Sequence, residues 1–205
     1  MPQVIEYQHV LGRMQDAGLR SLYYHSGAFG FPQGELARVF GWIGPVDPTI
    51  RDAARPFTRK APKPYEASLA NLAERAWQSL LTGPVWIMPK SHWAYELDFG
   101  SRQWMPDLLA EVGLRADQLA GRNDASAIEF SPTEATPFRR MVLGLLVSLH
   151  GSDFAMAFPG RPVVCTIHSH KQLWWTTTDD SIADGLDALL PPPPQPLMAH
   201  AVHNT

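Results

Sequence analysis

Cysteine is almost absent from this sequence, and its scarcity narrows the chemistry. Cys165 is the only cysteine among the 205 residues, so the chain can form neither an internal disulfide nor a zinc site built from several thiolates. The residues around it, from Val163 to Ile167, are apolar or β-branched. We therefore expect a buried, unreactive thiol within a strand.

Charge and long apolar runs are also scarce. Charged residues make up 18% of the chain and the net charge is −3, which gives no electrostatic reason to expect binding to nucleic acid or to an anionic membrane. No stretch approaches the ~20 apolar residues of a membrane span. The first residues lack a basic region followed by an apolar one. We expect a cytoplasmic protein that binds neither nucleic acid nor membrane.

Familiar catalytic and nucleotide-binding motifs are missing as well. The sequence holds no glycine-rich dinucleotide or phosphate loop, no GxSxG elbow, no HExxH helix and no calcium loop. Its length and even composition favour a single domain over residues 1–190. Residues 191–205 are a proline-rich tail. There, Pro191 to Pro194 predict either a polyproline II segment that an aromatic-lined groove could bind or a plain terminal linker.

The clearest strands lie in the C-terminal third of the chain. Apolar alternation and β-branched residues predict three strands, over residues 153–158, 162–168 and 173–178, joined by two tight turns as an antiparallel meander. Successive strand residues point to opposite faces of a sheet, so Trp174 and Trp175 must lie on different sides.

Helices are predicted where apolar residues recur every three or four positions. The strongest stripes cover residues 66–81 and 137–149, and weaker ones cover 2–17, 35–40 and 180–189. Together with the strands, these helices predict an α+β domain. Its sheet should be single, antiparallel or mixed, with five to seven strands and with helices packed mainly on one face. The 137–149 helix should lie across the apolar face.

Three further stretches alternate between apolar and polar residues. In residues 91–100, alternation places Glu96 and Asp98 on one face of a strand, and in residues 127–131 it places Glu129 on a polar face. Residues 20–25 also alternate, and an aromatic loop follows them, which predicts a sheet edge and a loop that folds back on the core.

If these strands share one sheet, their polar side chains gather on one face. The predicted catalytic residues are His168, His170 and Glu129, and the predicted ligand contacts are Glu96, Asp98, Trp174 and Trp175. We expect His168 and Glu129 to lie within one side chain's reach, in a concavity with His170 at its rim. Carboxylates beside imidazoles suit general acid and base work, and their oxygen and nitrogen atoms suit a divalent metal. The alternative is a solvated outer face whose charges pair across strands.

One short string is similar to a known signature. His168-Ser169-His170-Lys171-Gln172-Leu173-Trp174 resembles the His-x-His-x-Gln signature of galactose-1-phosphate uridylyltransferases, in the histidine-triad superfamily. The resemblance implies nucleotidyl transfer, with His170 as the nucleophile and Gln172 as a phosphate contact. It covers seven residues of the chain.

Two classes of function remain open at this point. The first is a small ligand-binding protein or enzyme, of hydrolase or phosphoryl or nucleotidyl transferase type, with a small-molecule ligand on the polar sheet face. The second is a non-catalytic module, such as an adaptor or neutralising protein, that presents acidic and aromatic residues to a protein partner. Residues 43–64, rich in proline and basic residues, add either a lid over a ligand or a wrapped surface connection.

Overall fold

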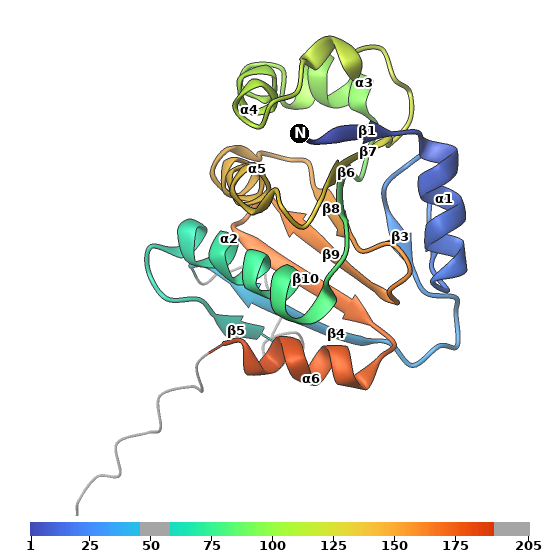
Figure 1. Cartoon of the computed structure of the whole chain (residues 1–205), viewed down its shortest axis with the longest axis vertical. Helices are drawn as coiled ribbons and strands as arrows, with labels where there is room; N and C mark the ends of the chain where they lie inside the picture. The colour runs from blue at the N-terminus through green and yellow to red at the C-terminus, as the bar shows by residue number, and fades with distance from the viewer. Residues whose placement is uncertain (46–57, 191–205) are drawn as a thin grey trace, which may run out of the picture.

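An eight-stranded sheet forms the centre of the fold (Figure 1). The computed structural model describes residues 1–45 and 58–190. The strands, in spatial order, are β1 (Gln3–Ile5), β7 (Ala127–Phe130), β6 (Val85–Pro89), β8 (Phe154–Ala157), β9 (Val163–His168), β10 (Gln172–Thr177), β4 (Arg38–Ile43) and β5 (Thr58–Lys60). Neighbouring strands are antiparallel, except that β4 and β5 are parallel. The α+β class is therefore confirmed, with a mixed sheet of eight strands in place of the expected five to seven.

One face of this sheet is covered mainly by helices. They are α2 (Tyr65–Ala76), which continues into the π-helical turn η2 (Trp77–Leu81), α4 (Met105–Glu111), α5 (Ala135–Ser148) and α6 (Asp180–Ala188); a short 3-10 helix, η4 (Ala116–Gln118), follows α4. Their apolar stripes pack with large sheet residues, such as Trp42, Phe130 and Trp175, to form the main core. Met141 and Leu145 of α5 are fully buried, as its stripe predicted.

The opposite face carries α1 (Tyr7–Asp16) and a two-stranded sheet made of β2 (Arg20–Ser21) and β3 (Phe29–Gly30). Figure 1 shows α1 and β3 side by side, away from α2 and α5. α1 contributes Tyr7, Val10 and Met14 to a second, smaller core. The large sheet meets them partly with small side chains, including Ala155 and Ala157. Small residues there allow the helix to lie close to the strands.

The predicted meander is confirmed as β8, β9 and β10. Trp175 is fully buried in the main core, whereas Trp174 lies half-buried on the opposite face, as the pleat of a strand requires. Cys165 of β9 is also fully buried, and burial raises the pKa of its thiol well above the ordinary value. The thiol therefore stays protonated and enclosed, in agreement with its expected lack of reactivity.

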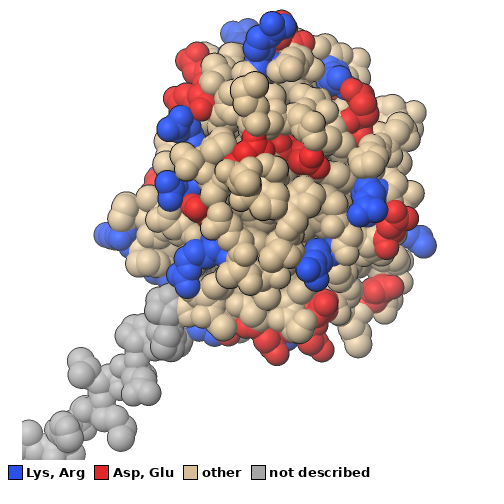
Figure 2. All heavy atoms as spheres, in the orientation of Figure 1, with Lys and Arg blue, Asp and Glu red and all other residues tan. Residues whose placement is uncertain are grey.

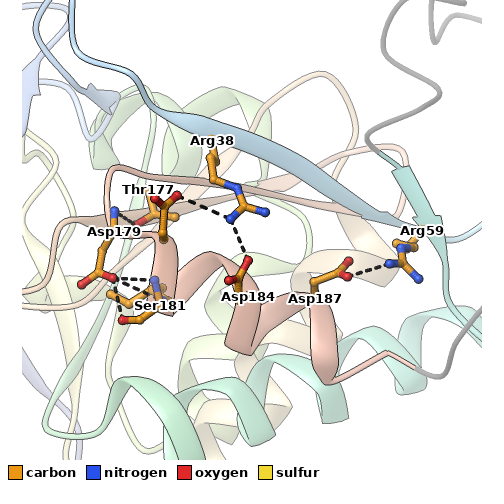
Figure 3. Close-up of polar contacts among 9 residues, drawn as sticks. Arg38, Arg59, Thr177, Asp179, Ser181, Asp184 and Asp187 are labelled. Carbon is orange, nitrogen blue, oxygen red and sulfur yellow. Dashed lines mark hydrogen bonds and ion pairs between the residues drawn. The ribbon is translucent and has the colours of Figure 1, made fainter.

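Arginines of β4 and β5 contact aspartates of α6 (Figure 3). Arg38 of β4 lies 2.7 Å from Asp184, and Arg59 of β5 lies 2.6 Å from Asp187. At the start of the helix, the Asp179 carboxylate accepts hydrogen bonds from backbone N–H groups of the first turn. The buried side chains of Ile182 and Leu186 pack α6 against the main core, and the arginine contacts lie at the more exposed margin of the helix.

Residues 91–100 are helical, which corrects the predicted strand. The short helix α3 (Trp93–Tyr95) leads into the π-helical turn η3 (Glu96–Gly100), and Nδ1 of His92 accepts the backbone N–H of Tyr95. Trp93 is fully buried while Phe99 is 73% exposed, so the alternating apolar residues do not share one buried face. Trp93 and Leu97, four residues apart, turn inward together instead.

Three predictions near the N-terminus are wrong in their boundaries or type. Residues 2–17 open with β1 before α1 begins, and residues 20–25 form a strand only at β2. Residues 35–40 were expected to form a helix, yet Leu36 is 95% exposed and the chain enters β4 at Arg38. Pairing of β4 with β10 outweighs the local helical preference there.

Two of the predicted segments fall wholly or partly outside the described residues. The proline-rich stretch 43–64 begins in β4, and its residues 58–60 form the edge strand β5. Residues 46–57 and the tail 191–205 are not described, so the lid and polyproline interpretations stay predictions.

Within residues 1–45 and 58–190, no helix is long and apolar enough to cross a membrane. On the face drawn in Figure 2, acidic and basic side chains are scattered over a larger uncharged surface. The cytoplasmic location and the absence of a nucleic-acid partner stay predictions.

Candidate functional site

His168 and His170 lie together at one end of the sheet. His168 ends β9, and His170 lies in the turn that leads to β10, with ring centroids 4.9 Å apart. The backbone N–H of His170 donates to His168 Nδ1 at 3.2 Å. Because Nδ1 accepts this bond, a neutral His168 carries its proton on Nε2.

Asp153 faces that second nitrogen of His168. The distance from His168 Nε2 to Asp153 Oδ1 is 3.8 Å, and Lys90 Nζ lies 3.9 Å from the other carboxylate oxygen. Asp153 also accepts the backbone N–H of Ser169 at 3.3 Å, which fixes its position beside the turn. A carboxylate behind an imidazole can orient it and stabilise its protonated form.

Trp174 and Gln172 continue this polar end of the sheet along β10. The indole N–H of Trp174 donates to Gln172 Oε1 at 2.7 Å, and its ring lies over Gly41, where a Cβ atom would come within 3.0 Å of the indole. Gln172 is buried and orients Trp174, which differs from the phosphate contact that the signature implies. Trp175 points into the main core and cannot contact a ligand on this face.

Glu129 is not brought near His168. It lies opposite Trp86, which lies opposite Ala157, which in turn lies opposite Val164, four residues before His168. Three strand spacings and four residues along β9 separate the two side chains by roughly 20 Å. Glu129 instead accepts hydrogen bonds from Gln3 and from the Trp86 indole. The expected concavity that joins His168 to Glu129 does not form.

Glu96 and Asp98 do not share a face, because their segment is helical. Asp98 is exposed, whereas Glu96 is fully buried. Hydroxyl groups of three serines donate to the Glu96 carboxylate, from Ser91 and Ser101 at 2.7 Å and from Ser152 at 3.2 Å. Glu96 thus holds three loops together and is closed to a ligand in this conformation.

A groove that the sequence did not predict lies between α1 and residues 18–35. It encloses about 970 Å³ and its lining is a mixture of aromatic and polar side chains, among them Tyr7, Gln8, Gln15, Arg20, Tyr24 and His25. We refer to it as the α1 groove. Three consecutive residues on its rim are open to solvent: Leu22 is 57% exposed, Tyr23 71% and Tyr24 90%.

The backbone beneath these exposed side chains is firmly anchored. The Leu22 N–H donates to the Ala28 carbonyl at 2.8 Å, the Ala125 N–H donates to the His25 carbonyl at 2.9 Å, and the Gly27 N–H donates to Pro89 at 3.2 Å. A Cβ atom at residue 27 would lie 2.4 Å from the Pro89 carbonyl oxygen, so only glycine fits this approach. The rim is therefore held to the second core at several points.

A row of three rings links the rim to α1. The rings of Tyr24 and His25 stack with centroids 3.8 Å apart, and His25 lies 5.4 Å from the ring of Tyr7. The Tyr7 hydroxyl lies within 3.3 Å of the Ser21 hydroxyl and donates to the Ser26 carbonyl at the same distance. His25 adopts φ of 55°, an uncommon backbone conformation for a residue with a side chain. Strained backbone conformations of this kind are often found at binding sites, where the surrounding contacts hold the residue in place.

One signal in the sequence pointed to this site. The run Leu22-Tyr23-Tyr24 places three large side chains in a row, which alternation cannot bury on a single face of a strand. The aromatic residues after it behave as expected, since Phe29 is buried and Phe31 is half-buried. The sequence could not show that the side chains of Leu22, Tyr23 and Tyr24 stay exposed to solvent.

The arrangement of possible metal ligands gives no support to a metal site among the described residues. Within the described part of the chain, no group of three or more His, Cys, Asp or Glu side chains is arranged to hold a metal ion. Comparison with known proteins found no matching family model, no similar curated protein and no similar solved structure.

Proposed function

We propose that this protein is a non-catalytic binding module that holds a segment of a partner protein in the α1 groove. The observation that carries the proposal is the exposed run of Leu22, Tyr23 and Tyr24 on an anchored backbone. Large apolar side chains exposed in a row are costly in water unless something covers them. Tyrosine is also enriched among the residues that dominate binding energy at protein interfaces.

The anchoring of the rim supports the same function. A loop that is already ordered loses little conformational entropy on binding, so more of the contact energy appears as affinity. The stacked Tyr24 and His25 rings offer a fixed flat surface, and Gln8, Gln15 and Arg20 place polar groups beside it. Apolar faces and hydrogen-bonding groups side by side suit a peptide, which presents both.

A library of displayed peptides tests this function. Selection on the wild-type protein should recover peptides whose affinity falls at least about tenfold in Tyr24→Ala, the size of one interface hot spot. Phe99→Ala is the matched control, because Phe99 is an exposed aromatic residue at a different surface. Both variants should keep the wild-type melting temperature. Recovery of no peptide, or of peptides that bind Tyr24→Ala as well as wild type, would refute the proposal.

A second candidate function is catalysis at the His168 end of the sheet. The two imidazoles of His168 and His170, with ring centroids 4.9 Å apart beside the Asp153 carboxylate, favour it, since imidazoles near a carboxylate suit proton transfer. His170 would supply the second imidazole, as the uridylyltransferase signature implies. A panel of phosphate esters and nucleotide sugars should then include one whose turnover is lost in both His168→Ala and Asp153→Asn. Turnover that persists in His168→Ala would exclude this site.

A further inference from the structure

The α1 groove places hydrogen-bonding side chains beside exposed aromatic rings. Its lining includes the hydroxyl groups of Tyr23 and Tyr24, the amides of Gln8 and Gln15, and the guanidinium of Arg20, while Glu35 is the only carboxylate among the lining residues. An ordinary extended peptide brings one N–H donor and one carbonyl acceptor per residue. Arg20 can only donate, and the hydroxyl and amide groups can donate as well as accept, so the groove can also bind a chain whose backbone brings acceptors alone.

A run of prolines is such a chain. Proline has no backbone N–H, and its ring holds φ near −65°, so a proline run presents carbonyl oxygens and flat apolar rings at little entropic cost. Grooves lined with aromatic side chains are a general means of binding it. The rings of Tyr24 and His25 stack at the groove, where Tyr24 is exposed and His25 half-buried, whereas the neighbouring Tyr7 ring is buried. Hydrogen-bonding groups beside exposed aromatic rings therefore suit a proline-rich segment.

This chain contains one such segment, Pro191-Pro192-Pro193-Pro194-Gln195-Pro196. We infer that the α1 groove binds residues 191–196 of a second copy of the chain. The inference rests on the proposed function, because it names the partner segment for the same groove. Two copies can each place this segment in the groove of the other, which closes a symmetric pair.

The position of α6 excludes the chain's own groove as the binding site for this segment. α6 ends beside the edge strand β5 on the helical face, whereas α1 lies over β6, β7 and β8 on the opposite face (Figure 1). Four strand spacings from β5 to β8 already measure about 19 Å, before the path around the sheet edge. Residues 191–196 span only about 19 Å when fully extended as polyproline II. Since they begin directly after Leu190, they end before they reach the groove of their own molecule.

Sedimentation of full-length proteins over a wide range of concentrations tests the inference. The wild type should self-associate, and association should weaken at least about tenfold in Tyr24→Ala and in a variant with Pro191→Ser, Pro192→Ser, Pro193→Ser and Pro194→Ser. Phe99→Ala should associate like the wild type. A mixture of the two weakened variants should associate more than either variant alone and less than the wild type, because a mixed pair restores one of the two contacts.

The outcomes separate this inference from the proposed function. A wild type that stays monomeric at every concentration overturns the inference, and so does a mixture that fails to restore association. If the displayed peptides bind at the groove but none is proline-rich, and a synthetic Leu-Pro-Pro-Pro-Pro-Gln-Pro-Leu peptide does not bind, the inference fails while the groove keeps its proposed function. If no peptide of any kind binds at the groove, both fail.

Discussion

The face of the sheet beneath α2 and α5 is filled by large side chains, whereas the face beneath α1 combines small residues with a few large ones. Trp42, Phe130 and Trp175 belong to the first face, and Ala155 and Ala157 belong to the second. The helical face is closed over most of the sheet. On the second face, the surface around Trp174 is only half-buried. The α1 groove lies on the same face, away from Trp174, beside α1.

This difference indicates which face has exposed residues that are available for binding without disturbing the main core. Large side chains fill the helical face, so a change there is felt by the whole core. On the second face, α1 and residues 18–35 add a layer whose outer side is exposed to solvent at Leu22, Tyr23 and Tyr24. The exposed aromatic residues of the groove belong to that outer layer, and backbone hydrogen bonds beneath them anchor the layer to the rest of the fold.

The largest expected effect comes from the adjacent tryptophans on the two faces. Trp175→Ala should lower the free energy of unfolding by about 3–5 kcal/mol, because it leaves a cavity between Trp42 and Phe158. Trp174→Ala, on the half-buried face, should cost about 1 kcal/mol. Urea denaturation of both variants measures the contrast, and equal losses would contradict the assignment of the two faces.

A third variant separates ring packing from hydrogen bonding at Trp175. Among the described residues, its buried indole N–H has no hydrogen-bond acceptor, so the indole loses its bonds to water without replacement. Trp175→Phe keeps an aromatic ring and removes this N–H. It should therefore lose clearly less stability than Trp175→Ala in the same urea experiment.

The second prediction concerns the small residues beneath α1. Ala157→Leu should destabilise the protein by about 1–3 kcal/mol, because the larger side chain must displace α1 or strain the second core. Thr176→Leu is the matched control, since Thr176 is half-buried on the same face in β10. Thermal unfolding checks both variants; an unchanged melting temperature for Ala157→Leu would show that α1 does not pack closely there.

The third prediction concerns an ion pair that joins the helical layer to the turn beside His170. Lys171 in this turn contacts Glu66 of α2. Its hydrogen bond is the main cause that lowers the pKa of Glu66 below the ordinary value of 4.5. The unfolded chain therefore binds more protons near that pH, so the pair stabilises the fold above about pH 4.5 and ceases to do so as the pH falls through the folded-state pKa.

Lys171→Met tests this pair. It should cost up to about 1 kcal/mol at neutral pH, the range for partly exposed pairs, and less at pH 3. Urea denaturation at the two pH values measures the difference. A loss that is the same at both values would mean that the charge of Glu66 does not contribute to stability.

The smallest effect is expected at the exposed edge of the helical layer. Arg38 contacts Asp184, and both side chains are largely open to solvent, where water and salt screen the attraction. Arg38→Ala should therefore leave the melting temperature unchanged within error. A clear drop would show that apolar packing alone does not hold α6 against the sheet.

Regular periodicity made much of the fold predictable. The β8–β10 meander and the α5 stripe have strong local patterns, and burial follows directly from them. The prediction for residues 91–100 was wrong because four alternating apolar residues fit a strand as well as they fit a helix that buries only Trp93 and Leu97. The choice depended on contacts with distant segments, such as the bond from the Trp93 indole to the Ser126 carbonyl.

The candidate site was less predictable than the fold. Alternation correctly placed Trp174 and Trp175 on opposite faces, but it could not say which strands are neighbours. The strand order separates His168 from Glu129 and brings Asp153, which was not singled out, beside His168. The α1 groove combines a helix with the chain after it, so no single stretch of sequence contains it.

The sequence by itself determined the class of fold, the unreactive buried Cys165 and the opposed tryptophans, because each follows from composition or from the period of a single element. Only the tertiary structure decided the strand order, the buried role of Glu96 and the exposure of Leu22, Tyr23 and Tyr24. These properties depend on which surfaces meet after the chain has folded. Residues far apart in sequence compete for the same buried space, and the energies of those contacts outweigh local preference.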